Sequence, residues 1–281
     1  MIERTTGKVY LLGAGPGDPD LLTVKARHVI ERADVVLYDA LVNEAILDVA
    51  PISAETIDVG KRPTGGTRTT QAEINDLMVH HARRGATVAR VKGGDPTVYG
   101  RGGEEAQHLA SESIPFELVP GVSSVTAAPG VVGIPLTHRE RSSSVTIITG
   151  HEAVKEESAL DWNALAQMLG SGGTLVVLMG VRTLPRTVER LRDAGIEADT
   201  PVAMIERATW QDERTVAGTV ATIHDIAQAH GIESPAVTIF GDVVPVREEI
   251  RAYLSRGAQT APETRSMSSF EEDASVPVSQ R

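Results

Sequence analysis

The sequence contains no cysteine and very few aromatic residues. The absence of cysteine excludes disulfide frameworks, thiolate zinc sites and cysteine nucleophiles. Phe, Trp and Tyr make up only 3% of the 281 residues, which disfavours a nucleic-acid surface built from stacked rings. No apolar run approaches the roughly 18 residues that a transmembrane helix needs, and the N-terminus shows no signal-peptide pattern. We therefore expect a cytoplasmic protein.

Positive charge is also scarce, since 27 Lys and Arg face 38 Asp and Glu, for a formal net charge of −11. Such a surface repels polyphosphate and anionic lipid, so we predict neither a nucleic-acid partner nor a membrane partner. His80 and His81 are adjacent in a predicted helix and point to different sides. Because the histidines show no ligand spacing, we predict no metal.

Short runs rich in Val, Ile and Leu alternate with amphipathic stretches along the chain. This pattern is typical of a largely buried sheet whose strands are connected by helices, so we predict the α/β class. Helical spacing of apolar residues predicts helices within residues 22–33, 74–82 and 184–191. The predicted strands are Val9–Leu12, Val35–Tyr38, Thr87–Val91, Phe116–Val119, Val145–Thr149, Leu175–Met179, Val202–Glu206, Thr215–Ala217 and Val237–Phe240.

A polar segment, Gly133–Ser144, interrupts this alternation and is the best candidate for a domain boundary. We predict an N-terminal α/β domain over residues 1–136 and a C-terminal α/β domain over residues 137–256. Residues 257–281 are rich in Ser, Pro and Glu and have almost no apolar periodicity, so we expect a disordered tail there.

Three loops rich in glycine or other small residues follow predicted strands. The first is GAGPGDPD, residues 13–20, in which Asp18 replaces the third glycine of a dinucleotide-binding fingerprint and is expected to cap a helix. The second is VKGGDPTVYGRGGEE, residues 91–105, where glycines permit close approach of a ligand and Asp95 offers a carboxylate. The third is VPGVSSVTAAPGVVGIPLTHR, residues 119–139. Tight turns, a capping Asp95 and close helix packing would explain the same residues without a ligand.

The order and spacing of these loops, together with the segments YDALV, VGKR, VTIITGH, ERAT and SPA, resemble the uroporphyrinogen-III C-methyltransferases of the tetrapyrrole methylase superfamily. The resemblance runs from about Val9 to Val244. It implies two α/β domains with a cofactor cleft between them, and a homodimer. The N-terminal domain would carry the substrate side and the glycine-rich loops, and the C-terminal domain would complete the cofactor pocket.

The reaction implied by the resemblance is methylation of uroporphyrinogen III by S-adenosyl-L-methionine at carbons 2 and 7. This would yield precorrin-2 through precorrin-1, with S-adenosyl-L-homocysteine as the other product, for sirohaem or cobalamin synthesis. Because the chain shows no dehydrogenase and chelatase module, we expect only the methyl transfers. By motif, Asp39 matches a proton acceptor and Lys61 a proton donor. A cap or salt-bridge partner at the end of a strand is the alternative for Asp39. The implied cofactor contacts are Pro16, Gly93, Gly94, Asp95, Val98, Ser123, Ser124, Met179, Ala208 and Ala236.

The tetrapyrrole substrate carries eight carboxylates, so cationic side chains are expected along its part of the cleft. Candidates are Arg62, Arg101, Arg139 and Arg141, each of which could equally be a solvated surface residue. Where many relatives have Phe-Ile-Phe, this chain has Thr97, Val98 and Tyr99, a departure that bears on substrate detail.

Three alternatives stay open at this point. A superfamily member of the same fold could methylate a later corrin precursor, ribosomal RNA or diphthamide, although VGKR and GRGGEE favour uroporphyrinogen III. A nicotinamide-dependent dehydrogenase is suggested by the strand before GAGPG and opposed by Asp18. A non-catalytic cofactor-sensing module is disfavoured because Asp39, Lys61 and the cofactor loops are all present.

Overall fold

Parallel strand pairing organises the first half of the chain in the computed structural model, which describes residues 6–60 and 69–260 and side chains up to residue 255. The first sheet has the strand order β3-β2-β4-β1-β5, and all its strands are parallel. Its elements in chain order are β1 (Lys8–Gly13), η1 (Pro19–Leu21), α1 (Val24–Ile30), β2 (Val35–Tyr38), η2 (Glu44–Val49), β3 (Glu55–Asp58), α2 (Gln71–Arg83), β4 (Thr87–Lys92), α3 (Gly102–Ser111) and β5 (Phe116–Val119).

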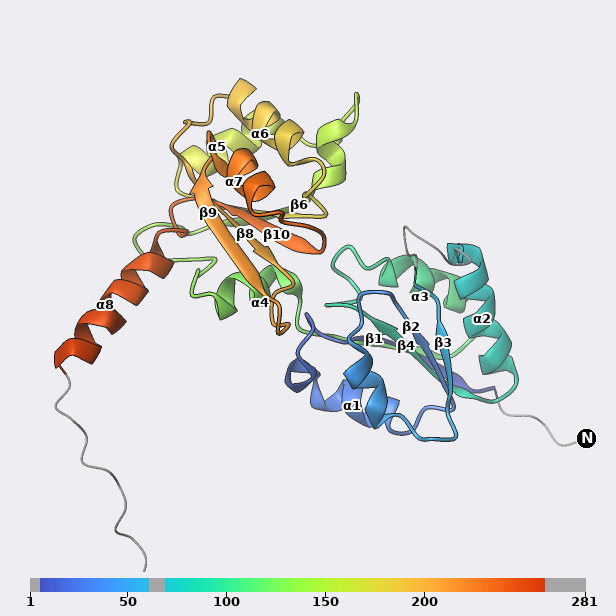
Figure 1. Ribbon diagram of the computed structural model, residues 1–281. Coiled ribbons are helices and arrows are strands. Elements are labelled where there is room, and N and C mark those ends of the chain that lie inside the picture. The colour runs from blue at the N-terminus through green and yellow to red at the C-terminus, as the bar shows by residue number, and fades with distance from the viewer. Residues whose placement is uncertain (1–5, 61–68, 261–281) are drawn as a thin grey trace, which may run out of the picture. The chain divides into compact units, whose positions relative to one another are not determined.

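Alternate residues of the central strands enter different cores. Val9, Leu11 and Val88 pack with Ile74 and Met78 of α2 and with α3, whereas Leu12, Val36 and Val91 belong to a core with α1 and η2. Since successive side chains of a strand point to opposite faces, both faces of the first sheet are covered by helices. Figure 1 shows α1 on one side of this sheet and α2 with α3 on the other.

Local sequence signals account for several helix ends. Thr70 and Glu73 form a capping box at the start of α2, in which Glu73 N–H donates to Thr70 Oγ1 over 3.2 Å and Thr70 N–H donates to Glu73 Oε2 over 2.6 Å. Asp18 caps η1, as its position before Pro19 predicts, although the element is a single short 3₁₀ turn.

The second sheet has the order β6-β7-β10-β8-β9 and mixes directions. The pair β6–β7 is parallel, while β10 pairs antiparallel with β7 and β8, and β8 with β9. The elements of this part are α4 (Ser124–Val131), β6 (Val145–Thr149), η3 (Gly150–Val154), α5 (Trp162–Gly170), β7 (Thr174–Leu178), α6 (Leu184–Asp193), β8 (Pro201–Glu206), β9 (Arg214–Thr219), α7 (Ile223–Ala229), β10 (Ala236–Phe240) and α8 (Val246–Thr260).

This second sheet is also covered on both faces. Leu175, Val177 and Met204 belong to a core with α5, α6 and α7, and Val176, Leu178 and Ile205 belong to a core with α4. Helix α4 precedes the predicted boundary at residue 136, yet its Val125 and Ala128 pack with β7, β8 and β10. The domain boundary itself stays a prediction.

The nine predicted strands are confirmed to within one or two residues at their ends, with Met179 lying just beyond β7. Helix α8 continues to Thr260, so residues 257–260 are helical where we predicted the tail to begin. Residues 261–281, the rest of the predicted tail, lie outside the described residues. By internal contacts the chain divides after Arg247 into two units. Within the described part, no helix is both long and apolar enough to cross a bilayer.

Candidate active site

Three loops meet at the carboxyl edge of the first sheet, where parallel strands commonly present a ligand site. Gly15 N–H donates to Gly94 O over 3.2 Å, and Gly94 N–H donates to Gly15 O over 2.7 Å. A Cβ on Gly13 would lie 2.4 Å from Gly94 O and 2.6 Å from the Cα of Gly121. The loops therefore cross backbone to backbone, an approach that only glycine permits.

Asp95 ties the second loop to the third. Its Oδ2 accepts the N–H of Gly121 over 3.0 Å, and its Oδ1 accepts the N–H of Thr97 over 2.8 Å. Burial acts to raise the pKa of Asp95, but the hydrogen bonds from the Thr97 hydroxyl and from backbone N–H groups outweigh it and leave this pKa below its usual value. The carboxylate is thus already used to hold the loops together.

The backbone of Gly94 has open space on the side where a side chain would begin. Gly94 has a φ of 67°, and a Cβ placed on it would have only the Ser124 backbone N within 4 Å, at 3.8 Å. Ser123, the N-cap residue of α4, precedes this nitrogen. Pro16, Gly93, Gly94, Asp95, Ser123 and Ser124 are therefore brought to one edge of the first sheet.

The second sheet reaches this edge through the connection between β8 and β9. Asp18 N–H donates to Thr209 Oγ1 over 3.0 Å, and Trp210 Nε1 donates to Pro16 O over 3.1 Å. Ala208 directly precedes these two residues and is buried. Ala236 pairs with Glu206 in the β8–β10 ladder. The contacts of Thr209 and Trp210 therefore connect the segment that contains Ala208 to the first glycine-rich loop, and Ala236 lies opposite the last residue of β8.

The last two predicted cofactor residues lie on the side of the second sheet. Val98 packs against the core formed by α4 and the second sheet. Met179 follows β7 with a φ of 54°, and 44% of the residue is exposed. A non-glycine residue held in this left-handed conformation is uncommon and frequently marks a functional loop.

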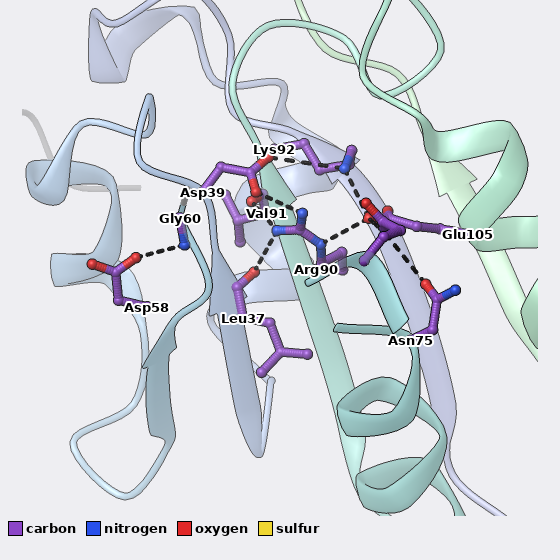
Figure 2. A network of polar contacts seen from close by, with 10 residues as sticks. Leu37, Asp39, Asp58, Gly60, Asn75, Arg90, Val91, Lys92 and Glu105 are labelled. Carbon is purple, nitrogen blue, oxygen red and sulfur yellow. Dashed lines mark hydrogen bonds and ion pairs between the residues drawn. The ribbon is translucent and has the colours of Figure 1, made fainter. Parts of the chain in front are cut away.

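A cluster of four charged side chains lies next to the glycine-rich loops, at the carboxyl ends of β2 and β4 (Figure 2). Arg90 is only 2% exposed and donates from Nη2 to Asp39 Oδ1 over 2.6 Å. Its Nη1 donates to the carbonyl of Val91 over 3.2 Å. The guanidinium therefore holds the Asp39 carboxylate in position through a charge-assisted hydrogen bond.

Glu105 of α3 completes the cluster from the opposite side. Its side chain is 0% exposed, and its Oε1 accepts from Arg90 Nε over 3.3 Å, from Lys92 Nζ over 3.0 Å and from Gln71 Nε2 over 3.0 Å. Burial lowers the pKa of Lys92, and the positive charge of Arg90 lowers it further, while Asp39 and Glu105 act in the opposite direction. Two buried cations and two carboxylates thus balance within one cluster.

Asp39 is the one member of this cluster that reaches solvent, with 29% of its side chain exposed. Its Oδ1 is taken by Arg90, whereas its Oδ2 lies 3.8 Å from Lys92 Nζ. Within the cluster, Oδ2 therefore makes the longer and weaker of the two ion pairs of the Asp39 carboxylate. Gly60 packs against Ala40, which brings Val59 and Gly60, the first two residues of the VGKR segment, to the same strand end.

The remaining predicted residues are less tightly connected to this site. Lys61 and Arg62 lie outside the described residues. Arg101 precedes α3 with a φ of 59° and pairs with Glu104 over 3.5 Å. Arg139 is exposed in the turn 138–142, and Arg141 donates to the carbonyl of Asp242 over 3.3 Å. Arg139 and Arg141 therefore lie in the connection between the two sheets.

Sequence reasoning missed Arg90, Lys92, Glu105 and Trp210. A usable signal existed for the first two, because they are charged residues in a strand that is otherwise apolar. Charges in a central strand are buried and need partners of opposite sign. The identity of those partners depends on strand register and on the placement of α3, which the spacing alone does not give.

The fold and the site define the class of protein. It is an α/β enzyme in which glycine-rich loops at the edge of a sheet adjoin a partly exposed carboxylate that is paired with a buried arginine. The chain belongs to the Tetrapyrrole (Corrin/Porphyrin) Methylases, whose family model matches residues 8–224.

Individual relatives agree with this assignment. The chain is 54% identical to the S-adenosyl-L-methionine-dependent uroporphyrinogen III methyltransferase of Methanosarcina barkeri over 86% of this chain and 94% of that protein. It is 47% identical to the uroporphyrinogen-III C-methyltransferase of Priestia megaterium, over 85% and 98% respectively. A structure of the Thermus thermophilus uroporphyrin-III C-methyltransferase with S-adenosylhomocysteine is 39% identical and superposes with a TM-score of 0.71, covering 85% of this chain and 94% of that one.

Proposed function

We propose that this protein is an S-adenosyl-L-methionine-dependent C-methyltransferase that converts uroporphyrinogen III into precorrin-2 for sirohaem or cobalamin synthesis. Family membership and the 54% identity to a uroporphyrinogen III methyltransferase support the reaction class. The observation that carries the chemistry is the partly exposed Asp39 carboxylate, held by buried Arg90 beside the glycine-rich loops. Methylation at carbons 2 and 7, through precorrin-1, is part of the proposal.

The residues at the loop crossing fit S-adenosyl-L-methionine. The space beside Gly94 is open, and the missing side chain of Gly94 lets the backbone approach a ligand closely, while the missing side chain of Gly13 permits the loops to cross. The cofactor, when bound, supplies an electrophilic methyl group on a sulfonium sulfur, and the sulfur keeps the electron pair of the carbon–sulfur bond that breaks. The residues proposed to hold it are Pro16, Gly93, Gly94, Asp95, Val98, Ser123, Ser124, Met179, Ala208 and Ala236.

Asp39 is the proposed proton acceptor. When a pyrrole carbon of the substrate gains a methyl group, the macrocycle must release one proton to restore its charge. Asp39 Oδ2 is the oxygen proposed to take that proton, because Arg90 occupies Oδ1 at 2.6 Å whereas Lys92 Nζ lies 3.8 Å from Oδ2. General-base assistance of this kind contributes ~10² to 10⁴ in rate. Lys61 remains the proposed proton donor, and Arg62, Arg101, Arg139 and Arg141 the proposed anchors for substrate carboxylates.

A homodimer and a cytoplasmic location complete the proposal. Leu118 on β5 and Ile147 on β6 are partly exposed, and each lies on the last strand at one side of its sheet. Exposed apolar residues on sheet-edge strands favour burial in an association. Sedimentation equilibrium at micromolar concentration should give twice the mass of the chain, and a single-chain mass would contradict the homodimer.

The decisive experiment is an anaerobic incubation with uroporphyrinogen III and S-adenosyl-L-methionine labelled with ¹³C in its methyl group. We expect a product that carries two labelled methyl groups, whose ¹³C signals locate them on the macrocycle. A parallel reaction offers a later corrin precursor, the substrate class of the alternative superfamily members. Methylation of that precursor alone would contradict the proposed substrate, and transfer to neither would contradict the proposed function.

A further inference from the structure

Trp210 lies outside every motif considered above, yet its side chain joins the two sheets. It belongs to the connection between β8 and β9, and its indole Nε1 donates to Pro16 O in the first glycine-rich loop over 3.1 Å. The contact spans 194 residues of sequence. Of the two tryptophans in the chain, Trp162 is buried in the core with α5 instead.

The ring of Trp210 fills the space that Gly17 leaves empty. A Cβ built on Gly17 would lie 2.0 Å from Trp210 Nε1 and 2.4 Å from its Cδ1, so any side chain there would displace the indole. The Arg207 guanidinium covers the ring at 4.2 Å from its centroid, and Arg207 Nε is in turn held by Asp212 over 2.7 Å. A cation over an indole at this distance adds attraction to the packing.

The backbone on either side of Ala208 is fixed as well. Arg207 and Thr209 have φ values of 46° and 71°, conformations that cost a non-glycine residue free energy and persist only when contacts enforce them. Thr209 N–H donates to Glu213 Oε2 over 2.9 Å, and Thr209 Oγ1 accepts from the Asp18 N–H over 3.0 Å. The segment 207–213 therefore makes two side-chain hydrogen bonds to the first loop, from adjacent residues.

We propose that Trp210 is a positioning residue for the cofactor: its indole holds the Pro16–Gly17 segment in register with Ala208, so that the two halves of the cofactor pocket are aligned before the ligand arrives. This inference rests on the proposed function, because Pro16 and Ala208 are proposed cofactor contacts. Because pre-alignment lowers the free-energy cost of ordering the pocket on binding, the Trp210 contact should increase the affinity for the cofactor. The tetrapyrrole side of the site, at Asp39 and Arg90, is held by a separate set of contacts.

The test compares the same substitution at the two tryptophans. Trp210→Phe keeps an aromatic ring against Gly17 and Arg207 but removes the N–H donor, and we expect the Kd for S-adenosylhomocysteine to rise about threefold to tenfold, the effect of one lost hydrogen bond. Trp162→Phe is the matched control, because Trp162 Nε1 has no hydrogen-bond partner in the described part of the chain. Isothermal titration calorimetry should give Trp162→Phe the affinity of the wild type.

Two further measurements separate a positioning role from a general loss of stability. In steady state, Trp210→Phe should raise the KM for S-adenosyl-L-methionine and leave the KM for uroporphyrinogen III unchanged. Gly17→Ala, which displaces the indole from the opposite side, should raise the same Kd while Trp210 itself is retained. In the Trp162→Phe protein, the emission of Trp210 should change when S-adenosylhomocysteine binds.

The outcomes distinguish this inference from the proposed function. If the wild type binds S-adenosylhomocysteine and Trp210→Phe and Gly17→Ala bind it equally well, the positioning role of Trp210 is wrong and the proposed function stands. A rise in both KM values together would also overturn the inference, because it would indicate a general distortion of the site. If the wild type does not bind S-adenosylhomocysteine at all, the proposed function itself fails, and the cofactor role of Trp210 fails with it.

Discussion

Asp39 and Arg90 form the ion pair on which the proposed proton transfer depends. In Asp39→Asn the side chain keeps its size and can still accept the Arg90 N–H through its amide oxygen, but it no longer accepts a proton. We expect single-turnover methylation to slow by ~10² or more, with the Kd for S-adenosylhomocysteine unchanged. Rapid-quench measurement with enzyme in excess gives the rate of the chemical step directly.

The matched control for this prediction is Asp34→Asn. Asp34 precedes the same strand, β2, at its amino end, where its Oδ2 accepts the N–H of Thr87 over 2.7 Å. This variant should methylate at the wild-type rate. If Asp39→Asn is as fast as Asp34→Asn, Asp39 is not the proton acceptor, and positioning of the reactants must account for the rate.

Glu117, which lies outside the proposed site, makes the stability of the fold depend on pH through its ion pairs. Hydrogen bonds from Lys25 and from Lys8, the latter 2.7 Å from the carboxylate, lower the pKa of Glu117 to about 2. Because the folded-state pKa lies below the unfolded value, the carboxylate contributes stability above about pH 4.5. That contribution is lost as the pH falls from about 4.5 to 2.

Glu117→Gln should therefore be less stable than the wild type at pH 7, by no more than about 1 kcal/mol, because solvent screens exposed ion pairs. Urea unfolding at a series of pH values should show this difference shrinking below pH 4.5. It should also shrink in 1 M salt at pH 7. A difference that is independent of both pH and salt would contradict an electrostatic origin.

At the scale of elements, buried apolar runs were sufficient to predict most strands, but not their directions. Runs such as Val202–Glu206 and Val237–Phe240 look alike whether they pair parallel or antiparallel, so the mixed second sheet did not follow from the sequence. Strand β3, Glu55–Asp58, was missed because it pairs only with β2 and is largely exposed and polar. Its sequence, ETID, carries too little apolar signal.

The candidate site shows the same division between what motifs reveal and what they leave out. The glycine-rich loops could be singled out because small residues follow predicted strands, and Asp39 because YDALV resembles a family segment, while their roles stay predictions. The Arg90–Asp39 pair depends on the register of β2 with β4, Glu105 reaches Arg90 and Lys92 through the placement of α3, and Trp210 acts through the β8–β9 connection. Nothing in a single sequence specifies those contacts.

A substitution at Gly13 tests the close crossing of the three glycine-rich loops. Gly13→Ala would place a Cβ within 2.4 Å of Gly94 O, so the first two loops must separate. We expect a loss of about 1–3 kcal/mol in the free energy of unfolding, the usual cost of overpacking. We also expect weaker binding of S-adenosylhomocysteine, because Gly94 and Ser124 line the open space beside the loops.

Gly130→Ala is the control for this substitution. Gly130 lies within α4, and a Cβ there would meet no heavy atom within 4 Å. Alanine in a helix is favoured over glycine by roughly 0.5–1 kcal/mol, so this variant should be slightly more stable and bind the ligand normally. Urea unfolding and calorimetry on both variants test the pair. A Gly13→Ala protein that binds as the wild type does would show that the loop crossing is not part of the cofactor pocket.

At the scale of the whole molecule, the proposed cofactor site draws on both sheets. Pro16 and Gly94 belong to loops of the first sheet, whereas Ala208 and Trp210 follow β8 of the second. A ligand bound across these segments stabilises whatever part of the chain must be folded to bind it. If both sheets are needed, unfolding of each sheet is linked to the same ligand.

S-adenosylhomocysteine at 100 times its Kd should therefore raise the free energy of unfolding by about 2.7 kcal/mol, as mass action requires for one site. The Trp210→Phe variant, studied at 100 times its own Kd, retains Trp162 as a reporter in the core of the second sheet. The urea midpoint seen by Trp162 fluorescence should shift as far as the midpoint seen by circular dichroism, which averages over both sheets. The second sheet unfolds independently if the ligand leaves the urea midpoint seen by Trp162 fluorescence unchanged while the transition seen by circular dichroism divides in two. In that case the proposed contact of Ala208 with the cofactor would add nothing to cofactor binding.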